Sequence, residues 1–141
     1  MDAQALAHLR YEFRSSIGEA LVNEDEFVDR CSQWMSKRLN GLGPWHCWVA
    51  VDKARIVGNL WLQIIEKIPN PIDEPEYHGY ITNVFVQESA RGRGLGSKLL
   101  TTSLEFCKEE RVHQIVLWPA QGSIEFYLQH GFSEPIDILR L

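Results

Sequence analysis

Residues 90–98 read A-R-G-R-G-L-G-S-K, with a glycine at every second position from Gly92 to Gly96. The run I-T-N-V-F-V (81–86) before this stretch predicts a strand, and the amphipathic run K-L-L-T-T-S-L-E-F-C (98–107) after it predicts a helix. Glycine permits positive φ and removes the side chain that would keep a ligand away from the backbone. Such a turn points several amides into one concavity at the positive end of the helix dipole. Because Arg91 and Arg93 add positive charge, the stretch predicts a phosphate-binding turn at residues 91–97.

The main alternative is a surface loop in which the glycines allow tight turning and the arginines aid solubility. The strand before the loop and the apolar helix after it weaken this alternative. Two common phosphate loops do not fit. A P-loop requires G-x-x-x-x-G-K-[ST], whereas Ser97 here separates Gly96 from Lys98. A dinucleotide-binding turn requires G-x-G-x-x-G, whereas the spacing here is G-x-G-x-G. A nucleotide-binding domain is therefore kept only as a lesser hypothesis.

Length and composition indicate one globular domain spanning residues 1–141. The chain has 45% hydrophobic and 23% charged residues, which is ordinary for a globular protein. A length of 141 residues suffices for one buried core. A net charge of -5 argues against a nucleic-acid-binding protein, which would usually be basic, and permits a basic substrate. The apolar runs are too short to span a membrane, and no signal-peptide pattern opens the chain.

The cysteines and histidines do not indicate a metal site or a disulfide. Cys31, Cys47 and Cys107 are widely spaced, odd in number and each within an apolar stretch. This pattern favours buried thiols in a reducing compartment. The five histidines show no metal-ligand spacing. We therefore expect a cytoplasmic protein without a bound metal.

The hydrophobic periodicity along the rest of the chain predicts a mixed α/β domain with the element order ααβββαβαβ. Asn23 is expected to cap the second helix and Asn40-Gly41 to end it. The strands expected at 45–51 and 56–65 are joined by a short turn and predict a hairpin, and a proline-rich loop is expected after it, at 67–76. The expected elements are, in chain order, helices at 3–14 and 24–39, strands at 45–51, 56–65 and 80–86, a helix at 95–109, a strand at 114–118, a helix at 123–130 and a strand at 136–141.

Two motifs of this chain resemble one known family. Arg91, Gly94 and Gly96 match the pattern [RQ]-x-x-G-x-[GA], which resembles the acetyl-coenzyme A pyrophosphate loop of the GCN5-related N-acetyltransferases, the GNAT superfamily. The run I-T-N-V-F-V-Q-E-S-A-R-G-R-G-L-G-S-K-L-L (81–100) resembles that family's fourth strand, loop and third helix. The run S-I-E-F-Y-L-Q-H-G-F (123–132) resembles its fourth helix and the glycine-phenylalanine that follows.

The resemblance covers residues 45–141 well and the two N-terminal helices by position only. It implies the GNAT fold, a mixed and mostly antiparallel twisted sheet flanked by helices. The chain opens at M-D-A-Q-A-L, inside the first helix, so the family's usual first strand is expected to be missing. Either the start is truncated, or the sheet has an exposed edge that a second copy could cover, which makes a homodimer a hypothesis.

The resemblance also implies an N-acetyltransferase that moves an acetyl group from acetyl-coenzyme A, as co-substrate, to a primary amine. In this family two strands splay apart, the pantetheine amides pair with one strand edge, and the pyrophosphate lies on the glycine turn. The positions that would contact the cofactor here are Val84, Phe85, Val86, Arg91, Gly92, Arg93, Gly94, Leu95, Gly96, Ser97 and Ser123.

Tyr127 stands four residues before Gly131-Phe132, where the family carries its general acid. The resemblance therefore implies a catalytic role in which its phenol donates to the leaving thiolate. A core tyrosine on an apolar helix face is the alternative. A backbone amide near Val84 would donate to the carbonyl oxygen. The general base is left open among water, Glu66, Glu74, Glu76 and His78.

One departure from the family pattern affects the cofactor site. Ala120 stands where many relatives carry an asparagine that contacts the cofactor, and Gln121 or Ser123 would have to replace that contact. Together with the missing first strand, this departure favours a catalytically inactive acyl-coenzyme A-binding or regulatory module as the alternative function. Tyr127 favours an enzyme.

The acceptor is expected to be a small-molecule or peptide amine. By the resemblance, the segments at 15–26 and 66–78 would grip it, and acidic loops suit a cationic acceptor. The alternative is that these acidic residues only keep the protein soluble. Trp45, Trp48 and Trp61 are expected mostly in the core, with one of them as a candidate wall of the acceptor pocket. The acidic residues of the two segments are Glu19, Glu24, Asp25, Glu26, Glu66, Asp73, Glu74 and Glu76.

Overall fold

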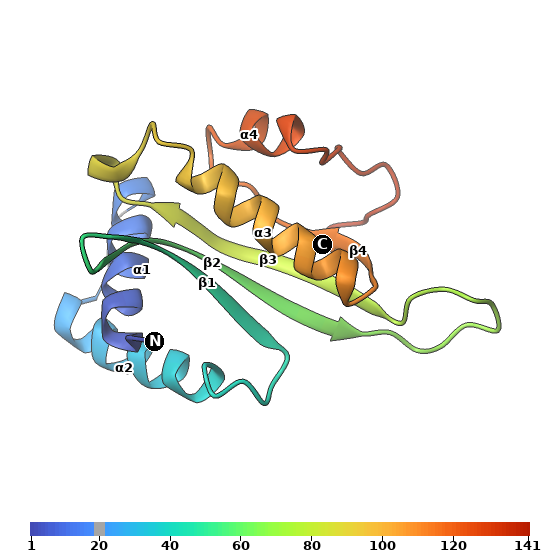
Figure 1. The fold of residues 1–141 in the computed structure, drawn as a ribbon, viewed down its shortest axis with the longest axis horizontal. Coiled ribbons are helices and arrows are strands. Elements are labelled where there is room, and N and C mark those ends of the chain that lie inside the picture. Colours follow the sequence, from blue (N-terminus) through green and yellow to red (C-terminus); the bar gives the residue numbers. More distant parts are fainter. Residues whose placement is uncertain (19–21) are drawn as a thin grey trace.

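The computed structural model describes residues 1–18 and 22–141, which form a sheet with helices on both faces (Figure 1). A single turn of 3-10 helix, η1, leads from the third strand into the glycine turn. In chain order the elements are α1 (Ala3–Ile17), α2 (Glu24–Arg38), β1 (Trp45–Asp52), β2 (Arg55–Glu66), β3 (Tyr77–Val86), η1 (Glu88–Ala90), α3 (Leu95–Glu109), β4 (Val112–Val116) and α4 (Ile124–Gln129).

The four strands form one sheet in the order β1-β2-β3-β4. β1 pairs with β2 and β2 with β3 in antiparallel fashion, whereas β3 and β4 are parallel. β1 and β2 form the hairpin that the sequence predicts, because only Lys53-Ala54 separates them. The predicted fold class, a mixed and mostly antiparallel sheet flanked by helices, is confirmed.

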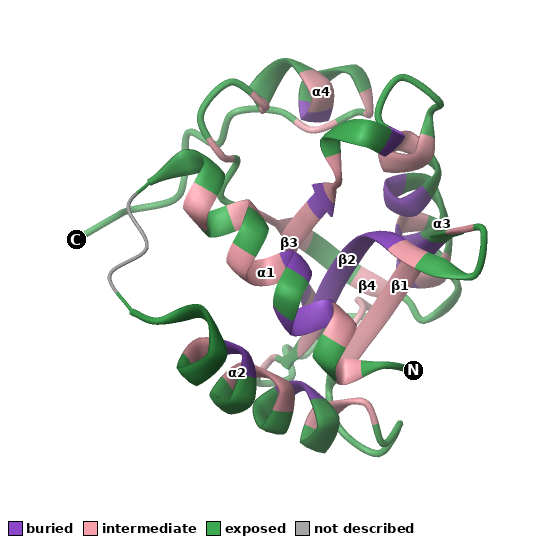
Figure 2. Ribbon diagram, turned by 90° about the vertical axis from the view of Figure 1, so that its left-hand side faces the viewer, coloured by how far each residue is buried: buried purple, intermediate pink, exposed green. Residues whose placement is uncertain are grey.

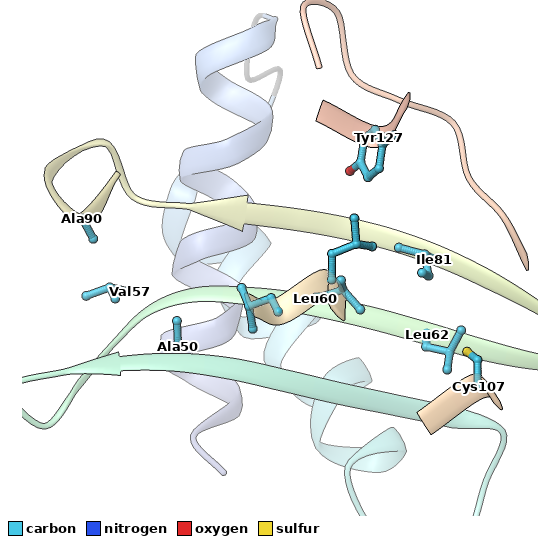
Figure 3. Close-up of a cluster of buried hydrophobic side chains, with 10 residues drawn as sticks. Ala50, Val57, Leu60, Leu62, Ile81, Ala90, Cys107 and Tyr127 are labelled. Carbon is cyan, nitrogen blue, oxygen red and sulfur yellow. The ribbon is translucent and has the colours of Figure 1, made fainter. Parts of the chain in front are cut away.

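β2 runs through the middle of the sheet, and its side chains alternate between two cores. Leu60 and Leu62 are fully buried in the core on the α3 side, together with Ile81 (Figure 3). Trp61 points to the opposite side, into a second core with Leu6 of α1 and residues of α2. Figure 2 shows α1 and α2 on one side of the sheet and α3 on the other. Each large apolar side chain buried in this way contributes roughly 1.5–3 kcal/mol, so the alternation along β2 holds both helical layers in place.

Both N-terminal helices begin at side chains that cap them. Oδ1 of Asp2 accepts hydrogen bonds from the amides of Gln4 and Ala5, at 3.0 and 3.1 Å. Asn23 caps α2 in the same way, as the sequence predicts, and the first turn of α2 is acidic. These oxygens satisfy amides that have no partner within the helix, and the acidic residues suit the positive end of the helix dipole.

The predicted final strand at 136–141 is wrong, because residues 133–141 form neither a helix nor a strand. Ile136, Leu139 and Leu141 are fully exposed. A strand needs a hydrogen-bonding neighbour, and a short apolar run carries no information on whether a neighbour is available. β4 also begins and ends two residues earlier than expected, at Val112 and Val116. The order of helices and strands is therefore ααβββαβα.

Gly58 of β2 lies where the backbone of β3 passes closely. A Cβ added there would come within 3.0 Å of the carbonyl oxygen of Phe85 and 3.1 Å of Cγ2 of Val86. We expect Gly58→Ala to lower the free energy of unfolding by about 1–3 kcal/mol through overpacking, as measured by urea denaturation. The control is Gly43→Ala, where an added Cβ meets nothing within 4 Å, and it should be neutral or slightly stabilising. Equal stability of the two variants would contradict this contact.

Candidate functional site

β3 and β4 pair only at the start of β3 and then part. The paired residues run from Tyr77 to Tyr80 on β3 and from Val112 to Val116 on β4. A cleft of about 1000 Å³ lies beside the remaining part of β3. Its volume is at the upper end of the usual range for ligand sites. Because β4 has left this edge of β3, the main-chain donors and acceptors along the edge are free to hold a ligand.

The cleft gathers most of the cofactor positions that the resemblance implies. They come from β3, the glycine turn, the first turn of α3 and the segment that leads into α4. Those that line the cleft are Val84, Phe85, Val86, Arg91, Gly92, Gly94, Leu95, Gly96, Ser97 and Ser123. The candidate catalytic residue Tyr127 lines it as well.

The glycine turn has the backbone geometry of an anion site. Gly92 and Gly94 have φ of 78° and 74°, in the left-handed region that glycine adopts without strain. Gly94 is the N-cap of α3, and it carries no side chain that could cap the helix. The amide of Lys98 donates to the carbonyl of Gly94 at 3.0 Å and so begins the helical ladder. The amides of residues 95–97 therefore have no partner within α3, and they border the cleft at the positive end of the helix.

The two arginines of the turn have different partners. Nε of Arg91 donates to the carbonyl of Val86 at 2.9 Å, and its guanidinium carbon lies 5.6 Å from the centre of the Phe85 ring. Nη1 of Arg93 instead lies 3.0 Å from a carboxylate oxygen of Asp52, at the end of β1. Arg91 lines the cleft, whereas Arg93 ties the turn to the hairpin and is the one implied cofactor residue outside the cleft lining.

β3 carries a bulge beside the cleft. Between its pairs with Asn59 and Trp61 of β2, two residues of β3, Asn83 and Val84, stand opposite one. Asn83 has φ of 54°, which asparagine tolerates better than most residues. Its Nδ2 donates at 2.9 Å to Oδ1 of Asn59, which is fully buried. A bulge bends the strand and changes the direction in which its backbone groups point. This bulge does so at Val84, which lines the cleft.

Tyr127 reaches the cleft from α4. Its ring is buried, at 7% exposure, and packs edge-on against Phe126 and Phe132. In Figure 3 its side chain points from α4 toward β3. Burial raises the pKa of Tyr127 to about 12. The phenol is therefore protonated at neutral pH and available as a hydrogen-bond donor in the cleft.

The segment before α4 forms another wall of the cleft. The hydroxyl of Ser123 donates to the carbonyl of Ala120 at 2.6 Å, and the amide of Ser123 donates to the same oxygen at 3.0 Å. The hydroxyl of Ser123 thus has only its oxygen lone pairs to offer a ligand. Gln121 also lines the cleft and brings a side-chain amide next to the position where Ala120 has none.

The cleft is lined by none of the four side chains that the sequence offers as general bases: Glu66, Glu74, Glu76 and His78. Glu74 is 3.1 Å from Nζ of Lys67, and hydrogen bonds from Asn70 and then Lys67 lower its pKa. His78 stacks on His113 with ring centres 5.8 Å apart, and burial lowers its pKa. Glu74 and His78 therefore have partners away from the cleft.

α1 supplies a wall of the cleft that the sequence interpretation missed. Arg10, Phe13, Arg14 and Ile17 recur at intervals of three and four residues, and all four line the cleft. This spacing places them on one face of the helix. Phe13 packs edge-on against Phe85 with ring centres 5.1 Å apart. Charged residues mixed into an apolar helical face were the signal that could have identified this wall.

Within residues 1–18 and 22–141, no group of three or more histidine, cysteine, aspartate or glutamate side chains is arranged to hold a metal ion. Cys107 is buried, and Cys31 and Cys47 are partly buried. Over the same part of the chain, no helix combines the length and the apolar character that crossing a membrane requires. Glu19, part of the expected acceptor segment, lies outside the described residues.

The fold and the cleft together define a mixed α/β domain with an open cleft beside two parting strands and a glycine turn at one end of it. A model of the acetyltransferase (GNAT) family matches residues 10–132. Since this match covers most of the chain, the chain belongs to the GNAT acetyltransferase family.

Solved structures share this fold, and a curated relative matches part of the chain. A GCN5-related N-acetyltransferase from Ralstonia eutropha has a TM-score of 0.81 at 23% identity, over 99% of this chain and 92% of that one. A predicted acetyltransferase from Clostridium acetobutylicum, solved with acetyl-CoA, has a TM-score of 0.80 at 18% identity, over 99% and 88%. An uncharacterized N-acetyltransferase of Methanocaldococcus jannaschii is 34% identical over 77 residues, which is 52% of this chain. The chain spans about 30% of that relative's length.

The bulge at Asn83 is testable by stability. We expect Asn83→Ala to lower the free energy of unfolding by about 1–3 kcal/mol, because alanine disfavours the left-handed backbone and Asn59 loses a donor. Asn83→Gly removes the same hydrogen bond but relaxes the backbone, so its loss should be smaller by about 1 kcal/mol. Urea denaturation of both variants measures the difference. If the alanine variant is as stable as the glycine variant, the backbone at Asn83 is unstrained.

Proposed function

We propose that this protein transfers an acetyl group from acetyl-coenzyme A to a primary amine. The observation that carries the proposal is the cleft between β3 and β4, where a strand edge, an anion-binding turn and a buried phenol meet. Each part serves one need of the reaction: the edge for the pantetheine arm, the turn for the pyrophosphate and the phenol for the leaving sulfur. Family membership supports the same donor.

The cleft fits the donor in shape and charge. Beyond Tyr80, the edge of β3 offers main-chain groups to the pantetheine amides, so residues 84–86 would hold the arm as a strand holds its neighbour. The pyrophosphate would lie on the amides of the glycine turn, with the guanidinium of Arg91 beside it. Once bound, the donor supplies a thioester carbonyl that is activated toward an amine.

The residues around the bulge and α4 match the charges that acetyl transfer creates. Attack of a neutral amine forms the C–N bond and breaks the C–S bond, so negative charge passes from the carbonyl oxygen to the sulfur. We assign the amide of Val84, which the bulge re-aims, as the donor to the oxygen. Tyr127 would donate a hydrogen bond to the sulfur. Its pKa of about 12 is far above the ~8.5 of a thiol, so the phenol keeps its proton and acts by hydrogen bonding.

Water would take the proton that the amine releases. The four side chains considered as bases lie outside the cleft lining. Glu12 and Glu88 do line the cleft, but they also border a surface hollow with Gln87, after the end of β3. Glu12 already accepts a hydrogen bond from Nε2 of Gln87 at 2.9 Å. A carboxylate base is therefore not part of the proposal, and the amine must reach the cleft in its neutral form.

Release of free thiol from acetyl-coenzyme A in the presence of a panel of primary amines tests this function. Release that depends on the amine, with one acetylated amine formed for each thiol, is the expected result. Tight binding of acetyl-coenzyme A without turnover on any amine would instead indicate an inactive binding module. Binding of ATP or NAD with no affinity for coenzyme A would indicate a nucleotide-binding domain.

Arg91 and Arg93 provide a matched pair for the placement of the pyrophosphate. We expect Arg91→Gln to raise the Kd for acetyl-coenzyme A about 10-fold, which corresponds to one hydrogen bond to a charged group. Arg93→Gln removes the same charge from outside the cleft lining and should raise the Kd only about 2- to 3-fold, because Arg93 acts through an exposed ion pair. Isothermal titration calorimetry measures both. A larger loss for Arg93→Gln would move the pyrophosphate away from Arg91.

Tyr127→Phe tests the donor to the sulfur. We expect kcat to fall about 100-fold, as for the loss of one donor to developing charge, with the affinity for acetyl-coenzyme A unchanged. The rate of the wild type should rise with pH as the amine loses its proton, and it should show no fall below about pH 10, since Tyr127 with a pKa of about 12 stays protonated there. A fall near pH 8–9 that Tyr127→Phe abolishes would mean that the phenol ionises during the reaction.

A further inference from the structure

A second pocket adjoins the cleft on the side of the sheet that α1 and α2 cover (Figure 2). It measures about 300 Å³, a volume at the lower end of the range for small ligands. Arg10, Tyr80, Thr82 and Asn83 line both the pocket and the cleft. The two hollows therefore meet at the bulge of β3, where the proposed reaction would take place. We call this second hollow the aromatic pocket.

Three tryptophans form the inner walls of the aromatic pocket: Trp34 from α2, Trp45 from β1 and Trp61 from β2. Their ring centres are 5.2, 5.9 and 6.2 Å apart, so the three rings pack against one another at steep angles. Nε1 of Trp61 donates to Oδ1 of Asn59 at 2.9 Å, which fixes the orientation of its ring. Walls of this kind suit an apolar or aromatic body and exclude a strongly hydrated one.

Arg10 stands where the aromatic pocket meets the cleft. Its Nη1 donates to Oδ1 of Asn83 at 3.4 Å, a long hydrogen bond to a neutral amide. Among the residues that the structure describes, no carboxylate forms an ion pair with Arg10, and no other aspartate, glutamate, lysine or arginine lines the aromatic pocket. Burial, and then the neighbouring Arg14, lower the pKa of Arg10. This is the direction expected for a half-buried cation whose charge is not compensated.

We infer that the acceptor amine carries a carboxylate, which Arg10 binds, and an apolar or aromatic side chain, which the aromatic pocket holds. An α-amino acid with a large apolar side chain has this chemistry. A carboxylate on Arg10 would bring the amino group near the bulge, because Nη1 of Arg10 lies 3.4 Å from Oδ1 of Asn83 and both residues line the two hollows. The inference rests on the proposed acetyl transfer and names the class of acceptor for that same site.

The charge of the shared wall argues against a cationic acceptor. A polyamine would bring positive charge next to Arg10 and Arg14 in a partly dehydrated site, where like charges repel strongly. The acidic side chains Glu66, Glu74 and Glu76, which would favour a cation, line neither hollow, and Glu12 and Glu88, which line the cleft, do not line the aromatic pocket. A carboxylate instead supplies the partner that the guanidinium lacks, and Arg pairs with carboxylates through two parallel hydrogen bonds.

Two amines that differ only in the carboxylate test the inference: L-phenylalanine and phenethylamine. We expect the wild type to favour L-phenylalanine at least about 10-fold in kcat/KM, which corresponds to one charge-assisted hydrogen bond. Arg10→Gln should abolish this preference by raising KM for L-phenylalanine, and a cooperative urea-denaturation transition reports that the variant is folded. Arg10→Lys keeps the positive charge but cannot form the two parallel hydrogen bonds of a guanidinium, so it should retain part of the preference. Arg30→Gln, on the exposed face of α2, removes the same charge and should behave as the wild type.

Trp34→Ala tests the aromatic pocket separately, because Trp34 is 38% exposed and its loss is tolerable for folding. It should raise KM for L-phenylalanine about 10-fold and leave KM for glycine unchanged, since glycine has no side chain to bury.

Several outcomes would overturn the inference. A wild type that favours phenethylamine, a polyamine or a phosphate-bearing amine over L-phenylalanine would do so, and so would a preference that survives in Arg10→Gln. Calorimetric titration of L-phenylalanine into the protein saturated with coenzyme A separates this inference from the proposed function. Arg10-dependent binding without turnover on any amine would refute the acetyl transfer and retain the pocket, whereas turnover of simple amines without such binding would retain the transfer and refute the pocket.

Discussion

The parting of β4 from β3 after Tyr80 is the constraint on which the cleft depends. If β4 paired with β3 along its whole length, the main-chain donors and acceptors of that edge would be hydrogen-bonded to β4 and none would remain for a ligand. Here the same divergence exposes that edge and leaves space beside it. The glycine turn continues the chain of β3 through η1, so the strand edge and the anion site are consecutive along one backbone. Their relative position is therefore set by the strand itself and does not depend on the packing of two separate elements.

A short polar chain runs through the otherwise apolar side of the sheet that α1 and α2 cover. Oδ1 of Asn59 accepts hydrogen bonds from both Trp61 and Asn83, and Asn83 in turn accepts one from Arg10. Buried polar groups are costly unless they are hydrogen-bonded, so this chain favours one arrangement of the bulge over others. Nδ2 of Asn59 is buried and finds no partner within the described residues. The described sheet thus contains an unpaired buried donor, Nδ2 of Asn59, next to the bulge of β3.

The parts of the site that could be predicted are those whose residues are neighbours in the sequence. The turn around Gly94, the helix that follows it and Tyr127 each belong to a local pattern with a direct structural meaning, and the structure brings them to one cleft. Contacts between residues far apart in the chain could not be predicted. The motif predicts Arg93 as a cofactor contact, and the sequence gives no sign of its ion pair with Asp52 of β1. Likewise, the acidity of a loop does not reveal which surface it faces, and the sequence alone does not show that Glu74 lies beside Lys67. The apolar run at 136–141 predicts a strand, but the run itself does not show whether a pairing strand is available, and the described part of the chain provides none.

The ties that hold the glycine turn affect how strongly it binds a ligand. Glycine-rich backbone is flexible, and fixing each residue of a free loop costs roughly 1–2 kcal/mol of conformational entropy. In this protein Arg91 is tied to the carbonyl of Val86 and Arg93 to Asp52, one on each side of Gly92. The amides of Ala90 and Arg91 are held by carbonyls of Gln87 and Glu88. Much of the ordering is therefore completed when the chain folds. The ligand meets a preorganised receptor, and less of its contact energy is consumed in shaping the turn.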